Sequence, residues 1–141
     1  MNSLTSSIIY FVLLCVLPVI VAAQDDKPDI HPIESAQAKC LKTHHGTMPR
    51  AKCYSDAALA WEKDVTKTYD TLLQTVKADD KTSLEASQTA WEKYRDAEFG
   101  FIAHIYGFKK GTGYISVRII KRMSIVRSRA LELEDWLQDL K

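Results

Sequence analysis

The stretch Leu84–Phe99, with the sequence LEASQTAWEKYRDAEF, has the spacing that decides the fold of this chain. Residues three and four positions apart lie on the same face of an α-helix. The stretch is therefore predicted to be helical, and one of its faces mixes apolar and polar groups, which indicates either a buried polar network or a binding surface. The residues of that face are Leu84, Gln88, Trp91, Arg95 and Glu98, with Tyr94 and Ile102 beside them.

Other parts of the chain also have helical spacing. A short helix is expected over 34–41, and a longer one from about residue 49 or 51 to 77, where apolar residues recur every three or four positions. A Thr82–Glu85 capping box predicts the start of the helix that contains the opening stretch and continues towards Ile105. A last helix is expected from a seven-residue repeat formed by Ile119, Met123, Val126, Ala130, Leu133, Leu137 and Leu140.

The fold class predicted from these segments is all-α. Three glycines within Gly107–Gly113 predict a loop between the last two helices. No segment alternates with period two for long enough to require a sheet, although 114–120 is compatible with an extended strand. We expect a small up-and-down helical bundle of three main helices plus a short N-terminal helix.

The N-terminus has the features of a secretory signal peptide. Residues 1–23 contain no charged side chain, are apolar from Ile8 to Val21, and end in Val-Ala-Ala before a polar segment. We expect a signal peptide over 1–23, a flexible leader over 24–33 and one helical domain over 34–141, with an uncleaved anchor as the alternative. The mature protein, about 118 residues long, is then secreted or periplasmic.

Cys40 and Cys53 remain in the mature chain. In an exported protein such a pair most simply forms a disulfide, which would close a short loop. His44 and His45 lie within that loop, so a zinc site with the two cysteines is the alternative. The spacing fits no standard zinc pattern. We therefore predict the disulfide, with no metal and no cofactor.

The charge balance bears on the partner. The formal net charge is +1, which argues against nucleic acid. Basic residues nevertheless cluster between Lys109 and Arg129, and acidic ones follow from Glu132 to Asp139. The cluster is either a basic helix flank neutralised by acids elsewhere in the fold, or a contact surface for an anionic partner or a membrane. We expect the former, with membrane contact only through the signal peptide during export.

Catalytic signatures are weak. No serine or cysteine lies in a recognisable nucleophile motif. Glu92, Asp96 and Glu98 offer carboxylates, but the spacing of Glu92 and Asp96 is that of a solvated helix face. We predict that the protein is not an enzyme, with a hydrolase that uses Glu92 or Glu98 as the minor alternative.

The segment Ala86–Glu98 resembles the signature of the LprI-like lysozyme-inhibitor N-terminal domain family, which reads roughly A-Q-x-x-W-x-x-Y/F-R-D-x-E-C. The Cys40–Cys53 spacing also resembles the first cysteine pair of that family. Matching positions extend over nearly all of the mature chain, although Thr66 stands where asparagine is usual. The resemblance implies that the family-signature residues have structural roles; in this chain they are Glu62, Tyr69, Gln88, Trp91, Tyr94, Arg95, Asp96, Glu98 and Arg129.

One departure from the family pattern predicts a change in packing. Many members have a cysteine where this chain has Phe99, so we expect Phe99 to enter the core. For the mixed face, Arg95 is expected to pair inside the bundle with Glu62, Glu98 or another acid, because its helical position lies next to Trp91. The alternative is that Trp91, Tyr94, Arg95 and Asp96 contact a partner protein, since Trp, Tyr and Arg dominate binding hot spots.

The resemblance implies an exported helical protein that binds another protein and inhibits a lysozyme or a related peptidoglycan hydrolase. The alternative is an envelope or effector-associated interaction module without lysozyme inhibition. We expect the partner to contact the outward carboxylates Glu92 and Asp96, or the disulfide-held loop over 43–50 with His44 and His45. The loop over 107–113 is a further candidate, but its basic character counts against it for a basic lysozyme.

Overall fold

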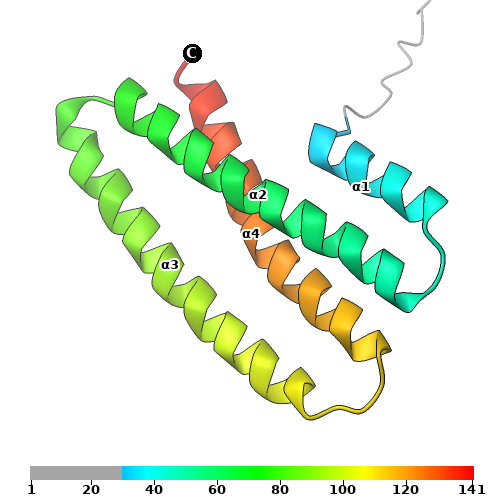
Figure 1. Ribbon diagram of the computed structural model, residues 1–141. Coiled ribbons are helices and arrows are strands. Elements are labelled where there is room, and N and C mark those ends of the chain that lie inside the picture. Colours follow the sequence, from blue (N-terminus) through cyan, green and yellow to red (C-terminus); the bar gives the residue numbers. More distant parts are fainter. Residues whose placement is uncertain (1–29) are drawn as a thin grey trace, which may run out of the picture.

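The computed structural model describes residues 30–141, so the predicted signal peptide and most of the predicted leader lie outside the described residues. Within residues 30–141 the chain forms four helices and no strand, which confirms the all-α prediction (Figure 1). The helices are α1 (Pro32–Thr43), α2 (Thr47–Thr75), α3 (Ala78–Gly107) and α4 (Gly113–Asp139).

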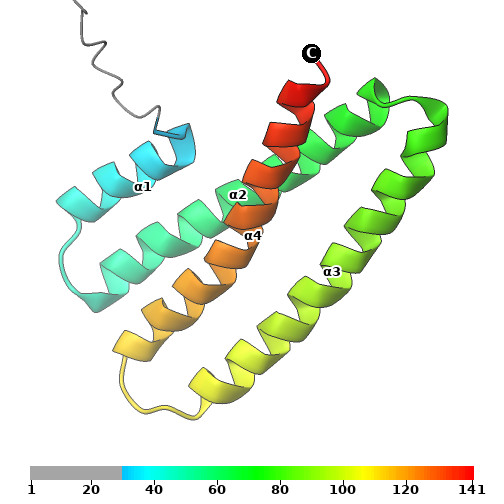
Figure 2. The same cartoon turned by 180° about the vertical axis from the view of Figure 1, so that it is seen from behind.

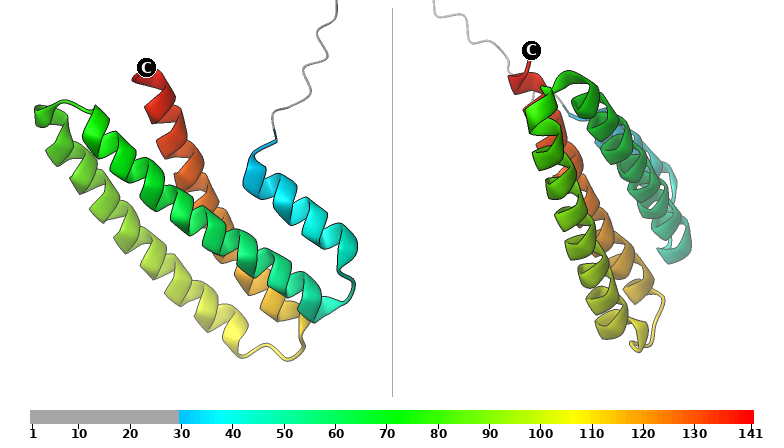
Figure 3. Two further views of the ribbon diagram at one scale, coloured as in Figure 1. Left: turned by 45° about the horizontal axis from the view of Figure 1, so that its top comes forward. Right: turned by 90° about the vertical axis from the view of Figure 1, so that its left-hand side faces the viewer.

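Helix α4 lies between α2 and α3. The most extensive packing joins α2 to α4, while α1 packs on α2 and α3 packs on α4. Seen from both sides, α1 and α3 flank the α2–α4 pair (Figures 1 and 2). The α2–α3 turn and the C-terminus of α4 lie at one end of the molecule, and the α3–α4 loop lies at the other (Figure 3). Helix α3 is therefore covered by α4 on one side only.

Several predicted boundaries were wrong. Helix α2, expected from residue 49 or 51 to 77, begins at Thr47 and ends at Thr75. Helix α3 begins at Ala78 and not at the Thr82 capping box, because Asp79 and Asp80 place two carboxylates in its first turn, where the helix dipole favours them. Residues 114–120, which the sequence left compatible with an extended strand, are helical and belong to the start of α4 at Gly113. Residues 32–33 of the predicted leader are the first turn of α1.

The core lies along the α2–α4 contact. Its largest fully buried side chains are Trp61 and Leu72 from α2 and Val126 and Leu133 from α4. Each such side chain contributes about 1.5–3 kcal/mol to the free energy of unfolding relative to an exposed one. Phe99 packs against this core as a half-buried side chain, as predicted.

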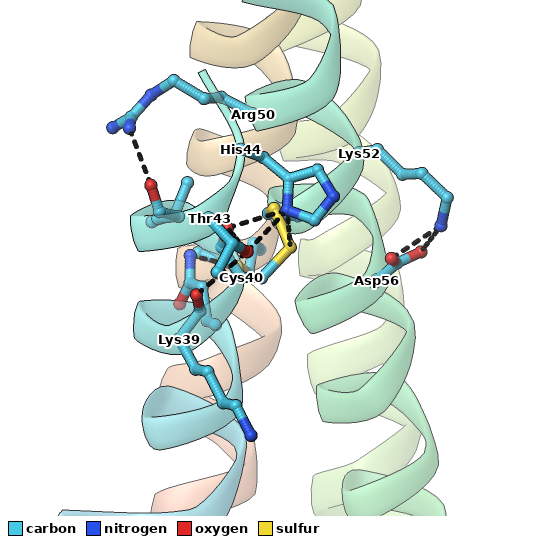
Figure 4. The surroundings of a disulfide bond; sticks show 11 residues. Lys39, Cys40, Thr43, His44, Arg50, Lys52 and Asp56 are labelled. Atoms are coloured by element: carbon cyan, nitrogen blue, oxygen red, sulfur yellow. Dashed lines mark hydrogen bonds and ion pairs between the residues drawn. A yellow bond between two sulfur atoms is a disulfide. The ribbon is translucent and has the colours of Figure 1, made fainter. Parts of the chain in front are cut away.

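The predicted disulfide is present and joins the end of α1 to the start of α2. Cys40 and Cys53 have a Cα–Cα distance of 5.8 Å, and Arg50 Nη1 donates to the Leu41 carbonyl oxygen at 3.3 Å across the same loop (Figure 4). Helix α1 has no fully buried residue, and this covalent link helps to hold it on α2. Closing a loop of this length restricts the unfolded chain and contributes about 2–3 kcal/mol. Paired with each other, the two sulfurs are not available as thiolate ligands, which removes the zinc alternative.

Among the helices described, none is both long enough and apolar enough to cross a bilayer.

Candidate functional site

A groove of about 390 Å³ lies between α3 and α4, beside the middle of the 84–99 stretch. Helix α3 supplies Trp91 and Tyr94 to its wall, and α4 supplies Arg129 and Glu132. Ser124, Ile125 and Ser128 complete the lining. The groove therefore combines two aromatic rings with an arginine and a carboxylate, which are groups that recur in protein-binding sites.

Arg129 forms the floor of this groove and is only 4% exposed. Its Nε and Nη2 both donate to Gln88 Oε1, at 3.2 and 3.1 Å, and Nη2 also donates to Ser87 Oγ at 3.3 Å. Nη1 donates to Glu132 Oε2 at 2.7 Å. The buried charge is thus hydrogen-bonded and paired, as a charge in a protein interior must be.

Two tryptophans flank the same guanidinium. The Arg129 Cζ lies 5.1 Å from the ring centroid of Trp136 and 5.8 Å from that of Trp91. A cation over an aromatic face is attracted by the ring quadrupole, more strongly where water is excluded. Arg129 therefore lies between Trp91 of α3 and Trp136 of α4 and links the two helices.

The electrostatics of the network extend to α2 through Tyr69. Burial of its hydroxyl group, followed by the carboxylates of Glu85 and Glu92, raises the pKa of Tyr69, while Arg129 acts in the opposite direction. Tyr69 itself packs against the core. The family-signature residues Tyr69, Gln88, Trp91 and Arg129 thus converge from three helices, as the prediction of a polar network requires.

The expectation for Arg95 was wrong. Arg95 Nε donates to Asp96 Oδ1 at 2.8 Å, and its guanidinium lies 5.1 Å from the centroid of Trp91, on the outer side of α3. It does not pair with Glu62 or Glu98, and Glu62 is exposed on α2. Because α3 is covered by α4 on one side only, a position next to Trp91 does not guarantee burial. Arg129 occupies the role that was predicted for Arg95.

The residues predicted to contact a partner fall into two separate places. Glu92 and Asp96 are exposed on α3, where Glu92 accepts a hydrogen bond from Gln88 Nε2 at 3.2 Å. Tyr94 lies on the same helix and is 54% exposed. His44 and His45 lie in the α1–α2 loop, which α2 and α4 separate from α3.

His44 takes part in closing the end of α1. Its Nδ1 lies 2.9 Å from the Cys40 carbonyl oxygen and 3.0 Å from Thr43 Oγ1, beside the disulfide (Figure 4). These contacts within its own turn give His44 a structural role. His45 is exposed in the same loop.

Sequence reasoning missed a second polar cluster, on the other side of α4. His31 Nε2 lies 3.2 Å from Glu134 Oε1 and 4.0 Å from Asp64 Oδ2, and its ring stacks on Trp61 with centroids 4.3 Å apart. His31 is also the N-cap of α1. Its position directly before Pro32 was the available signal, because proline is favoured in the first helical turn and a capping side chain precedes it.

The chemistry of this cluster favours hydrogen bonds over metal binding. The Ile33 backbone N–H donates to His31 Nδ1 at 3.2 Å, so Nδ1 has no proton and the neutral ring donates from Nε2 to Glu134. A metal-bound histidine instead uses one nitrogen as ligand and donates a proton from the other. Burial, and then the Glu134 carboxylate, raises the pKa of Asp64 above its ordinary value of 3.8.

With this geometry established, comparison with known proteins identifies the family. The family model described as "Lysozyme inhibitor LprI" matches residues 38–133. The chain belongs to the LprI lysozyme inhibitor family. The match covers the disulfide, the Arg129 network and the α3–α4 groove, and the family is one of inhibitors, not enzymes.

A solved structure is also similar to this LprI-family chain. It is the crystal structure of an uncharacterised protein from Burkholderia thailandensis, 29% identical, with a TM-score of 0.70 over 75% of this chain. The match covers 53% of that protein, so this chain spans about half its length. A comparison with curated proteins found no match. The disulfide and the family membership are both consistent with an extracytoplasmic location.

Proposed function

We propose that this LprI-family protein binds and inhibits a lysozyme-type peptidoglycan hydrolase through the exposed side of α3. The observation that supports this surface is the position of Tyr94, which is 54% exposed and lines the same groove as Trp91 and the buried Arg129. Hot spots in protein interfaces are enriched in Trp, Tyr and Arg held in well-packed surroundings. The same surface has the acceptor groups of Glu92 and Asp96 at its edge.

Charge distribution favours this surface over the other candidate loops for a basic hydrolase. Residues 78–98 contain six acidic side chains and three basic ones, whereas residues 99–131 contain no acidic side chain. Complementary charge accelerates association, and like charge opposes it. The disulfide-held loop has basic neighbours in Lys42 and Arg50, so a cationic partner is attracted more strongly to α3.

The test is a cell-wall turbidity assay with the chain from residue 24 onward. We expect a micromolar excess of the protein to slow the loss of turbidity that lysozyme causes. No slowing would contradict inhibition, and binding without slowing would favour the alternative of an interaction module. Clearing of the suspension by the protein alone would contradict the assignment as a non-enzyme.

Matched variants locate the surface. Tyr94→Ala should weaken binding by about thirtyfold if Tyr94 is a hot spot. Asp96→Lys should weaken it as well, whereas Asp56→Lys is the control, because both aspartates are exposed and pair with a neighbouring cation on their own helix. Loss of inhibition in a His44→Ala/His45→Ala variant, with Tyr94→Ala fully active, would instead place the partner on the disulfide-held loop.

A further inference from the structure

The end of the molecule formed by the α3–α4 loop has a composition unlike the rest of the chain. Residues 99–131 contain seven lysines and arginines and no acidic residue. Two of these cations are paired, Arg127 with Glu34 and Arg129 with Glu132. Within the described residues, Lys109, Lys110, Arg118, Lys121 and Arg122 have no ion-pair partner. Acids elsewhere in the fold therefore neutralise only part of the cluster.

Large apolar side chains are exposed at the same end. Phe108, in the loop itself, is 83% exposed, and Phe101 is 59% exposed. Ile105 and Tyr114 are also exposed. We call this surface the basic tip and define it by Phe101, Ile105, Phe108, Lys109, Lys110 and Tyr114.

The apolar residues of the basic tip lie on one continuous surface. Phe101, Ile105 and Phe108 are four and three positions apart, so they follow one face of the end of α3. A groove of about 260 Å³ beside them is lined by Phe101, Ile105 and Lys121. Lysines surround the aromatic rings, with Lys109 Nζ 5.4 Å from the ring centroid of Tyr114 and Lys121 Nζ 5.9 Å from that of Tyr106.

This combination fits one kind of partner better than others. An anionic polymer would bind the lysines but offers no apolar region for an exposed phenyl ring at the end of a loop. An anionic bilayer supplies phosphates for lysine side chains and, directly below them, an apolar region for Phe and Ile. The last seven residues of α3, from Phe101 to Gly107, span about 10 Å along the helix axis, which is comparable to the depth to which interfacial segments enter a membrane.

We propose that the basic tip binds the surface of an anionic phospholipid bilayer. Phe108 enters the boundary between headgroups and acyl chains, and Lys109 and Lys110 lie against the phosphates. This differs from the expectation that membrane contact is limited to the signal peptide. Glu92 and Tyr94 lie near the middle of α3, and Tyr94 is 14 residues, or about 20 Å along the helix, before Phe108 at the basic tip (Figure 3), so a bilayer that the tip enters by about 10 Å leaves both side chains accessible.

The experiment is vesicle sedimentation with the chain from residue 24 onward, which contains every described helix. We expect the protein to sediment with equimolar phosphatidylglycerol–phosphatidylcholine vesicles and to stay in solution with pure phosphatidylcholine vesicles. Since the attraction is electrostatic, molar salt should release the bound protein. Sedimentation with neither kind of vesicle would overturn the proposal.

Charge-reversal variants test the lysines. Lys109→Glu/Lys110→Glu should lower the partition coefficient by at least about tenfold. The matched control is Lys77→Glu/Lys81→Glu, two exposed lysines at the α2–α3 turn, at the other end of the molecule. Equal losses in the two variants would show that net charge and not the basic tip is responsible, and would contradict the proposal.

A second variant separates a bilayer from an anionic polymer. Phe108→Ser should also weaken vesicle binding, and its circular dichroism and melting temperature should not change because the side chain is mostly exposed. Polyglutamate should not compete efficiently with the vesicles. If Phe108→Ser binds vesicles like the wild type and polyglutamate displaces the protein, the partner is a polyanion and the lipid assignment is wrong.

Discussion

Helix α4 has a polar cluster on each of two sides, and the two clusters are built differently. On the α3 side, Arg129 is buried and donates to Gln88, Ser87 and Glu132. On the α2 side, Glu134 meets His31 and Asp64, where Asp64 Oδ2 is buried and accepts no hydrogen bond within the described residues. In the first cluster the buried charge has hydrogen-bond partners, and the cluster stabilises the fold. The second cluster places two carboxylates beside one imidazole, so its stability depends on protonation.

The largest effect is expected from Arg129. Arg129→Ala removes the cation between two tryptophans and leaves Gln88 Oε1 without its donors, so the free energy of unfolding should fall by about 3 kcal/mol. Urea unfolding followed by tryptophan fluorescence measures this change. Arg129→Lys, which keeps the charge but not the planar fork, should recover only part of the loss. A small effect of Arg129→Ala would show that the two clusters do not differ as described.

A smaller effect is expected from Gln88. Gln88→Ala keeps the Arg129–Glu132 ion pair but removes the acceptor of Arg129 Nε, so it should cost about 1–3 kcal/mol. The exposed neighbour Thr89 provides the control, since Thr89→Ala touches no part of the network. If the two variants have equal stability in the same urea titration, Gln88 is not an essential acceptor for the buried arginine.

In the second cluster, a substitution is expected to raise the free energy of unfolding and not to lower it. Because the pKa of Asp64 is raised in the folded state, its contribution to stability is present below the ordinary value of 3.8 and is lost as the pH rises through the folded pKa. Asp64→Asn should therefore stabilise the protein at neutral pH, by less than either loss in the Arg129 network. Urea titrations at a series of pH values should show the gain shrinking as the pH falls through the raised pKa of Asp64 towards 3.8. A gain that grows on acidification would reverse the sign and contradict this account.

The smallest effect is expected from Arg95. Its partner Asp96 is adjacent and exposed, and the pair has no contact across the bundle. Arg95→Ala should change the free energy of unfolding by no more than about 0.5 kcal/mol. A large loss in thermal denaturation would restore the earlier expectation that Arg95 is the central buried charge.

The helices and the disulfide could be predicted from the sequence because both depend on short-range spacing. Apolar residues such as Trp61, Leu72 and Leu133 mark the buried faces of α2 and α4, and two cysteines in a chain predicted to be exported have one simple pairing. The start of α3 at Ala78 was missed, since a capping box at Thr82 and acidic residues at 79–80 compete for the same helix start. The site was predicted only in part: Gln88, Trp91 and Arg129 were named, but Arg95 was given the wrong role.

The sequence by itself determined which segments are helical, which family the chain resembles and where its charges are concentrated along the chain. Only the tertiary structure decided which of two signature arginines is buried, because that depends on α4 covering one side of α3 and leaving the other open. It also brought His31, Asp64 and Glu134 together from three distant segments, which no local spacing encodes. Helical periodicity reports the face on which a side chain lies, whereas burial requires a second element to pack on that face.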